Sequence, residues 1–522
     1  MRGPGKDSCK LTLTSLLGGC SPKKARRGRC FQADRELFYK QQNQQRFCLY
    51  IMQKFKPVNT QQYFLLPPSV EDFIKEDHLA RVVAEVVDTL DTTSIEKQYS
   101  YLGQKSYHPK VLLKLLFYGY AIGIRSGRKI ASACESDVAF MYLASMYKPD
   151  FRTINDFRKD NVGVIEDLFK QVIELCSAMS MINIGTLVID STKLRANANN
   201  RRTKTKEQYE QWVSGIEQQV REVMEQADAT DNEEDEKYGD NRGDELPKEI
   251  NSKIKLKNKI KEAIKQLKEG EKQNLTDADA KVIKSGGTLR TNYNCQASVT
   301  TNGIIVSAYA TNAASDREHL LPVIEEAEKN TMQQAKTILA DSGYASYDNY
   351  EQLTRLCKNI LIPDQQKEDE IIKAAEDPFH KNHFRYDITT DQFICPEGKL
   401  LTLHRAAHLH KRTKQHCKIY RGIQCRGCLK KELCTKGKAR QIHVETRIPL
   451  RETIRQLLNS PPGKQLYKLR QQIIEPIFGN IKHNLQYIMM HLRTIKKVNG
   501  EWQLMCLTHN IKQIWKAKCQ FN

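Results

Sequence analysis

The sequence predicts an α/β fold built around a mixed β-sheet, because three of its segments carry strand patterns. Residues 186–189 form a short β-branched and aliphatic run that ends abruptly at Asp190. Residues 337–340 end in the same way at Asp341, and such runs are typical of strands buried on both faces. Between them, 289–309 holds two β-rich runs separated by Thr-Asn-Gly, which predicts a hairpin. The predicted order of these elements is strand, hairpin, helix, strand, helix, strand.

Length, charge and hydropathy restrict the class of protein. The 522 residues suffice for about two to four domains with cores of their own. A net charge of +21 favours a polyanionic partner, usually nucleic acid, although charge alone leaves an unrelated basic protein open. The longest apolar run, 111–124, carries Lys114 and is shorter than the roughly 18 to 20 apolar residues of a membrane span. The sequence shows no signal peptide, and its 15 cysteines suit reduced thiols in a cytosol.

Residues 1–51 differ in composition from the rest of the chain. They are basic, rich in glutamine and cysteine, and have no sustained apolar period. We expect them to be translated leader sequence outside the fold, with the true start at Met52. The alternative is a basic arm that contacts DNA.

Residues 52–165 predict an all-helical module that binds DNA. A basic turn between two of its helices carries Arg125, Arg128 and Lys129. A helix, a basic turn and a second helix suit contact with DNA, whereas the plainer interpretation is a helical bundle with solvated basic side chains. The predicted helices span 78–90, 109–123, 129–141 and 151–159.

Residues 166–363 hold the first part of the sheet core, interrupted at 203–283. Within the interruption, 207–227 and 248–268 carry apolar residues at helical spacing on charged segments, which predicts an inserted helical hairpin. The acidic stretch 228–245 between them is expected to form a mobile tip. The pattern leaves open whether the hairpin contacts DNA, contacts protein or serves as a spacer.

Lys193 and Arg195 lie on a polar, basic stretch directly after Asp190. Beside an acidic site, such side chains can position a phosphate group. A solvated loop explains them equally well.

Residues 364–445 predict a small β-rich insertion that contains cysteines. Its Cys-x-x-Cys pair with two further cysteines is a candidate for a structural, tetrahedral zinc site, separate from any catalytic metal. Unmetallated thiols are the alternative. The predicted ligands are Cys395, Cys425, Cys428 and Cys434, with Cys417, His404, His408, His410, His416 and His443 as substitutes.

A third acidic residue, Glu475, lies on a predicted helix in 446–522, the second part of the core. Two aspartates at the carboxyl ends of strands and a helical glutamate can together hold two divalent cations, which activate water and stabilise a leaving oxygen in phosphodiester chemistry. Either aspartate could instead cap the turn that follows it. Lys482 follows Glu475 by two helical turns, so both would share a helix face.

The segments 341–344 (Asp-Ser-Gly-Tyr) and 475–482 (Glu-Pro-Ile-Phe-Gly-Asn-Ile-Lys) resemble acidic motifs of the DDE transposases of bacterial insertion sequences, closest to the IS-four-like class. The likeness extends from about residue 55 to the C-terminus. It implies an RNase H-like core whose first and fourth strands lie side by side, with two Mg²⁺ (or Mn²⁺) ions on the three acids. Lys482, Arg470 and Tyr467 resemble the DNA-contacting residues of the signature, although Arg470 stands one residue further from the glutamate than the class spacing.

The resemblance also implies a function and partners. It implies metal-dependent cleavage of double-stranded DNA at the element's terminal inverted repeats and transfer of the freed ends into target DNA. A homodimer on DNA, in the bacterial cytoplasm at the nucleoid, is expected with it. The alternatives are an RNase H-like nuclease that does not join strands, and an inactive, zinc-containing DNA-binding relative.

Overall fold

The computed structural model describes most of the chain from Ser69 onward, and all the elements below belong to the unit Ser69–Asn522. The expectation that 1–51 is a leader lies outside the described residues. No helix in the described part of the chain is both long and apolar enough to cross a membrane. The described residues are 69–99, 106–238, 248–364, 372–387, 389–409, 416–445 and 448–521.

A six-stranded mixed sheet with the order β4-β5-β1-β7-β8 lies at the centre, and β6 pairs with β5. Strand β5 is antiparallel to β1, β4 and β6, whereas β7 is parallel to both β1 and β8. The predicted mixed α/β class is therefore confirmed. The strands are β1 (Thr186–Arg195), β4 (Lys281–Ser285), β5 (Thr288–Thr300), β6 (Ile305–Thr311), β7 (Thr337–Ala340) and β8 (Asn359–Leu361).

The centre of β1 is buried, as its apolar run predicts. Leu187, Val188 and Ile189 are each 0% exposed, because β5 and β7 flank the strand and helices cover the sheet. In the parallel register with β7, Ile189 lies opposite Ala340. The residues that follow these two, Asp190 and Asp341, therefore lie on neighbouring strands at the same level of the sheet. Asp341 follows the end of β7, whereas β1 continues beyond its predicted end at Asp190 to Arg195, because those residues still pair with β5.

The turn between β5 and β6 explains why this pair forms. Gly303 has a φ of +79°, a conformation that costs glycine little, and its N–H donates to the carbonyl of Thr300. Ser298 and Ser307 hydrogen-bond across the two strands at 2.7 Å. Helices α11 (Leu320–Thr331) and α12 (Tyr347–Arg355) follow in the connections before and after β7.

The N-terminal part is helical, as predicted. One predicted helix, 129–141, is in fact two, because the carboxylate of Asp137 accepts from the N–H groups of Ala139 and Phe140 and starts a new helix there. The helices are η1 (Val70–Phe73), α2 (Leu79–Thr89), α3 (Thr93–Glu96), α4 (Pro109–Ile122), α5 (Gly127–Ser136), α6 (Val138–Leu143), α7 (Phe151–Asp160), η2 (Val162–Val164) and α8 (Ile165–Ala178).

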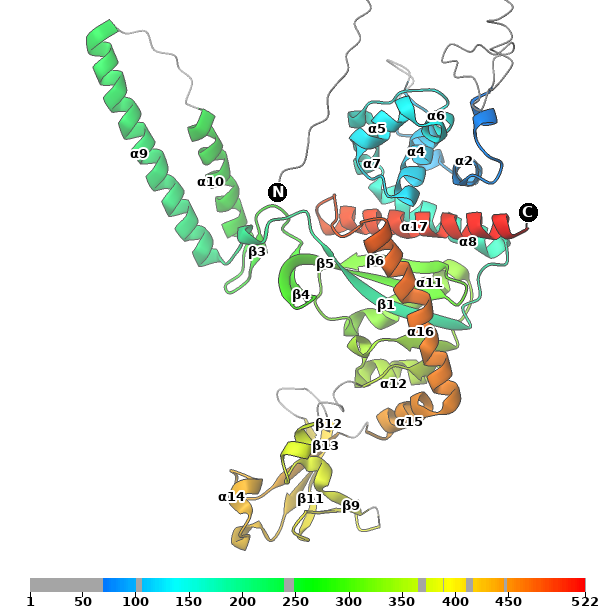
Figure 1. The fold of residues 1–522 in the computed structure, drawn as a ribbon. Helices are drawn as coiled ribbons and strands as arrows, with labels where there is room; N and C mark the ends of the chain where they lie inside the picture. Colours follow the sequence, from blue (N-terminus) through cyan, green and yellow to red (C-terminus); the bar gives the residue numbers. More distant parts are fainter. Residues whose placement is uncertain are drawn as a thin grey trace, which may run out of the picture. The chain divides into compact units, whose positions relative to one another are not determined.

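The last helix, α17 (Ile495–Phe521), joins the N-terminal helices to the sheet. It contacts α2, α4 and α8 as well as β6, and Figure 1 shows it between the helical part and the strands. The indole N–H of Trp502 donates to the carbonyl of Gln296 on β5, and Asn510 exchanges hydrogen bonds with the backbone of Ile305. The helix is therefore part of the core that all of these elements share.

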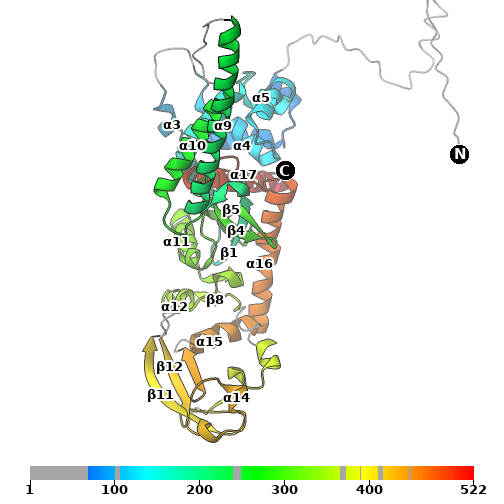
Figure 2. The same cartoon turned by 90° about the vertical axis from the view of Figure 1, so that its left-hand side faces the viewer.

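A helical pair leaves the sheet after β1. Helices α9 (Lys206–Tyr238) and α10 (Lys248–Gln266) lie side by side (Figure 2) around a small core that includes Tyr209, Ile216 and Ile260. Helix α9 continues through 228–238, where a mobile tip was expected, and 239–247 lies outside the described residues. The base of the pair is joined by β2 (Thr203–Lys204) and β3 (Gln273–Asn274).

After β8 the chain forms a second sheet with the order β13-β12-β11-β10-β9. Its own core includes Phe384, Leu401, Tyr420 and Ile442. The chain then returns along α15 (Ile448–Asn459) and α16 (Pro461–Gly479) to a π-helical turn, η8 (Asn480–Asn484). The second sheet and its helices are η6 (Lys381–His383), β9 (Arg385–Asp387), β10 (Gln392–Ile394), β11 (Leu400–Leu409), β12 (His416–Gly422), η7 (Cys425–Gly427), α14 (Lys431–Cys434) and β13 (Gln441–Glu445).

Glu326 on α11 makes the stability of the fold depend on pH. Burial, and then the nearby carboxylate of Glu166, raise its pKa from 4.5 to about 7. The folded chain holds this proton more tightly than the unfolded chain, so stability falls as pH rises from 4.5 towards 7. Glu326→Gln is therefore expected to stabilise the protein at pH 8 by about 1–2 kcal/mol, and progressively less towards pH 5. Thermal unfolding at both pH values tests this, with the exposed neighbour Glu325→Gln as control; an equal gain at both would contradict it.

Candidate active site

Asp190 and Asp341 use their two carboxylate oxygens differently. In Asp190, Oδ1 accepts from the N–H of Ser191, and Oδ2 lies 3.4 Å from the guanidinium of Arg470. In Asp341, Oδ1 accepts from the N–H of Gly343, and Oδ2 lies 3.7 Å from the same guanidinium. Asp341 thus caps the turn after β7 and still presents one oxygen to a shared cation.

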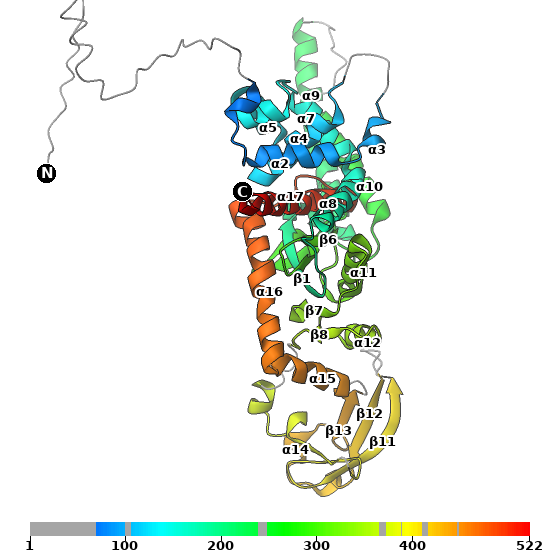
Figure 3. The ribbon, with the colours of Figure 1, turned by 90° about the vertical axis from the view of Figure 1, so that its right-hand side faces the viewer.

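The cation comes from α16, which contacts both β1 and β7 and runs alongside them in Figure 3. Arg470 also lies 3.3 Å from a carboxylate oxygen of Glu475 on the same helix. Three acids from β1, β7 and α16 therefore converge on one guanidinium. The side chain of Arg470 is 12% exposed, whereas that of Glu475 is 55% exposed, so the site is buried at the sheet and open at the glutamate.

The electrostatics of this cluster favour a cation. Burial raises the pKa of Asp190 to about 6, a rise that Arg470 opposes and the charges of Asp341 and Asp316 reinforce. Burial likewise raises the pKa of Tyr467, which lies one helical turn from Arg470. In the described part of the chain, Nε of Arg470 is buried and has no hydrogen-bond partner.

Asp316 is a fourth acid near this cluster, and it was not among the site residues predicted from the sequence. Its Oδ1 accepts from Asn294 at 2.7 Å and from Gln296 at 2.8 Å, and its Oδ2 lies 2.9 Å from Lys193. Burial alone raises its pKa, but these hydrogen bonds and the lysine outweigh burial and hold the pKa below its ordinary value. Polar Asn294 and Gln296 at buried positions of a strand were the signal available in the sequence.

The predicted phosphate-binding lysines have different environments. Lys193 is bound to Asp316 and to the hydroxyl of Ser191. Burial lowers the pKa of Lys482, while Cys295 and Asp190 nearby raise it. Lys482 lies in the π-helical turn η8, so the regular two-turn spacing predicted from Glu475 is not kept.

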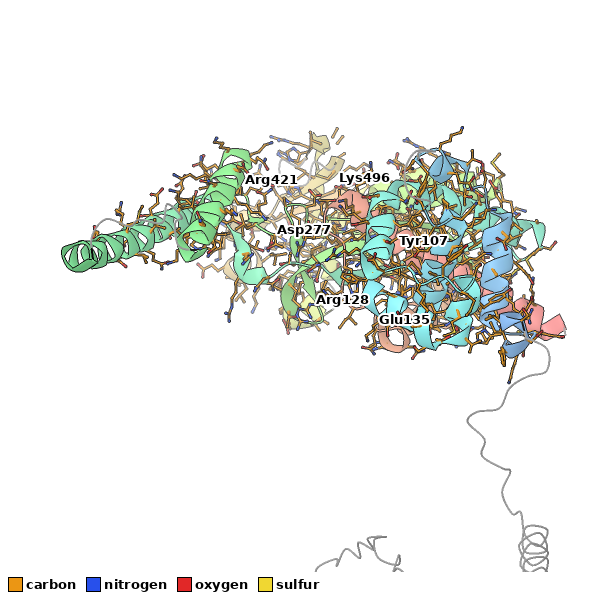
Figure 4. All side chains as sticks on the ribbon, turned by 90° about the horizontal axis from the view of Figure 1, so that it is seen from above. Tyr107, Arg128, Glu135, Asp277, Arg421 and Lys496 are labelled. Atoms are coloured by element: carbon orange, nitrogen blue, oxygen red, sulfur yellow. The ribbon has the colours of Figure 1, made fainter. Side chains whose placement is uncertain are left out.

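The predicted arginines divide into buried and exposed groups. Arg125 is 8% exposed, lies 4.3 Å from the ring centroid of Tyr487 and donates to the carbonyl of Met489. We therefore do not propose Arg125 as a residue that contacts DNA. Arg128, labelled in Figure 4, and Lys129 are exposed on α5, and Arg195 is exposed at the end of β1.

The four predicted zinc ligands, Cys395, Cys425, Cys428 and Cys434, line one small pocket. Burial raises the pKa of Cys434, and the other three thiols contribute to the rise. Within the described residues, however, no group of three or more His, Cys, Asp or Glu is arranged to hold a metal ion. The zinc prediction therefore has no support, and the same finding means that the three acids surround a guanidinium rather than a ready-made metal site.

Two family models match separate parts of the chain. Residues 394–515, which include Glu475 and Arg470, match the family model described as a transposase DDE domain. Residues 68–160, the N-terminal helices, match a second model, transposase domain DUF772. No curated protein matches the chain. Both matched models describe domains of transposases.

Arg470→Gln tests whether the three acids depend on this cation. Without the guanidinium they repel one another, so the variant is expected to lose about 1–3 kcal/mol of stability in EDTA, a value reduced by the exposure of Glu475. Adding Ca²⁺ is expected to restore much of the loss, because a divalent cation can take the guanidinium's place. The measurement is thermal unfolding with and without Ca²⁺. Arg355→Gln, an exposed arginine on α12, is the control, and equal stability of both variants in EDTA would contradict the assignment.

Proposed function

We propose that the chain is a DDE transposase that cleaves DNA at transposon ends and transfers the freed strands into target DNA. The observation that carries the proposal is the convergence of Asp190, Asp341 and Glu475, from three separate elements, on one cation. The two transposase family matches support the same class. The IS-four-like class, a bacterial origin and a nucleoid location are part of the proposal.

An RNase H-like core is proposed on the strand order. Across the sheet, β1 lies between the β5–β6 hairpin on one side and the parallel pair of β7 and β8 on the other. This order supports a core in which the first and fourth core strands, here β1 and β7, are neighbours. The domain boundaries given above remain predictions.

Asp190, Asp341 and Glu475 would hold the divalent ions, Mg²⁺ or Mn²⁺. Carboxylate oxygens suit these ions, and each aspartate keeps one oxygen free of backbone hydrogen bonds and turned to the shared cation. Such ions, when bound, activate the attacking oxygen and stabilise the leaving oxygen. Because Arg470 now occupies the space between the acids, it has to withdraw before ions bind there.

The chain's own basic and aromatic residues would orient the DNA. A withdrawn Arg470 would still lie on α16 beside the acids, with a bidentate donor set that matches a phosphate group. Tyr467 lies on the same helix. Lys482 lies close enough to Asp190 for that carboxylate to act to raise the pKa of the lysine. The mechanism uses no covalent protein nucleophile, so we propose that all three residues position the substrate.

The N-terminal helices are proposed to hold DNA further from the reacting phosphate. Arg128 and Lys129 are exposed there, and Arg195 is exposed at the end of β1. Two copies of the chain, each holding one terminal repeat, would bring both element ends together. We therefore propose a homodimer on double-stranded DNA.

Asp341→Asn is expected to abolish Mg²⁺-dependent nicking of supercoiled plasmid, with at least about a hundredfold loss of rate. Asparagine keeps the oxygen that caps Gly343, so the variant removes charge with little change in the turn. Duplex binding in EDTA is expected to persist. Asp167→Asn, an exposed acid on α8, is the control, and wild-type nicking by the Asp341 variant would rule out the proposed site.

A strand-transfer assay with paired end sequences separates the proposal from its nearest rival. A transposase joins the cleaved 3′-ends to a target plasmid, and joining is expected to be lost with nicking in Asp341→Asn. Cleavage without joined product would instead identify a nuclease that does not transfer strands.

A further inference from the structure

A basic cavity of about 610 Å³ opens beyond the end of β1. Four arginines from different segments line it: Arg195 on β1, Arg202 on η3 (Asn200–Arg202), Arg290 on β5 and Arg493 before α17. Its other lining residues are neutral, mostly asparagine and threonine, and none is acidic. A cavity of this composition selects for an anion.

Backbone and amide hydrogen bonds fix the walls of the cavity. The N–H of Arg195 donates to Ile488, and its carbonyl accepts from Met490, which ties β1 to the segment before α17. The amide of Asn197 donates to the carbonyl of His491 at 2.8 Å. The amide oxygen of Asn200 accepts from the N–H of Thr291 at 2.7 Å, which holds η3 against β5. The backbone segments that carry the arginines are therefore held in place by hydrogen bonds.

The positive charge of the cavity is not compensated within the described chain. All four arginines are exposed, and none forms an ion pair with a described residue. Asp277, close in sequence to the cavity residue Thr276, is engaged elsewhere: it accepts from the hydroxyl of Tyr293 and the N–H of Thr494. A ligand with several negative charges would relieve the repulsion among the guanidinium groups.

We propose that this cavity binds the phosphate backbone of double-stranded DNA away from the reacting phosphate; the identity of the partner rests on the proposed function. Arg195 lies five residues beyond Asp190 on β1, a separation of about 17 Å. That distance corresponds to about five base pairs of duplex. Guanidinium groups spread over four segments suit successive phosphates of a polymer better than one small anion.

The test compares full-length wild-type protein with Arg195→Gln/Arg290→Gln for binding of a 30-base-pair duplex, by fluorescence anisotropy in EDTA over a range of KCl concentrations. Each lost phosphate contact lowers the slope of log affinity against log salt by about 1. We expect the slope to fall by about 2 and affinity at 0.15 M KCl to fall by about 30-fold. Arg195→Lys/Arg290→Lys, which keeps both positive charges, is expected to restore the slope.

Two controls make the result specific to the cavity. Arg355→Gln removes one exposed arginine on α12, beside β8 at the other edge of the sheet, and is expected to leave the slope unchanged. Inorganic phosphate at constant ionic strength is expected not to displace the duplex. An unchanged slope in the folded double variant, or a change equal to that of Arg355→Gln, overturns the proposal, as does displacement of the duplex by phosphate.

The outcome is separable from that of the proposed function. A reduced slope together with wild-type nicking by Asp341→Asn would keep the cavity as a DNA site and remove the transposase assignment. An unchanged slope together with lost nicking by Asp341→Asn would do the reverse.

Discussion

The charge balance around Arg470 is the constraint on which the candidate site depends. Parallel pairing of β1 with β7 places Asp190 and Asp341 next to each other, and α16 brings Glu475 to them. Carboxylates this close to one another, with Asp190 buried, need a cation between them. In this structure the guanidinium supplies it, and in the proposed enzyme divalent ions would. The same packing that builds the sheet thereby creates a site with affinity for positive charge.

A buried charge pair connects the N-terminal helices to α17 and to the segment before it. Arg125 lies 3.6 Å from Glu501 of α17, whose side chain is fully buried. Glu501 also accepts from the N–H groups of His491 and Leu492, and burial raises its pKa. The segment it holds is the one that pairs with Arg195 and lines the basic cavity. The helical part, the cavity and β1 are therefore parts of one packed structure.

The sequence allowed prediction of local structure better than of long-range contacts. The strand that ends before Asp341 followed from an apolar run that stops at a charge, and the β5–β6 hairpin followed from Asn302-Gly303. The predicted end of the first strand at Asp190 was wrong, because pairing with β5 continues β1 through polar residues to Arg195. The prediction of a single helix over 129–141 was wrong, because Asp137 caps a new helix and divides the segment in two.

The partners of charged residues could not be predicted in this way, because they lie far away in the chain. Arg125 in a basic turn has the same local pattern whether it faces DNA or Glu501, 376 positions later. Asp316 could not be predicted as part of the site, because its partners Asn294 and Lys193 come from two strands that lie elsewhere in the chain. The convergence of Asp190 with Asp341 was expected only from the family resemblance, since periodicity predicts the order of strands and not which of them are neighbours.

The most direct test of the central claim is a crystal structure of the protein with Mn²⁺, with the metal located by its anomalous scattering. The account predicts Mn²⁺ bound by Asp190, Asp341 and Glu475, with the guanidinium of Arg470 withdrawn from all three. Mn²⁺ bound only elsewhere, with Arg470 still in contact with the three acids, would contradict it.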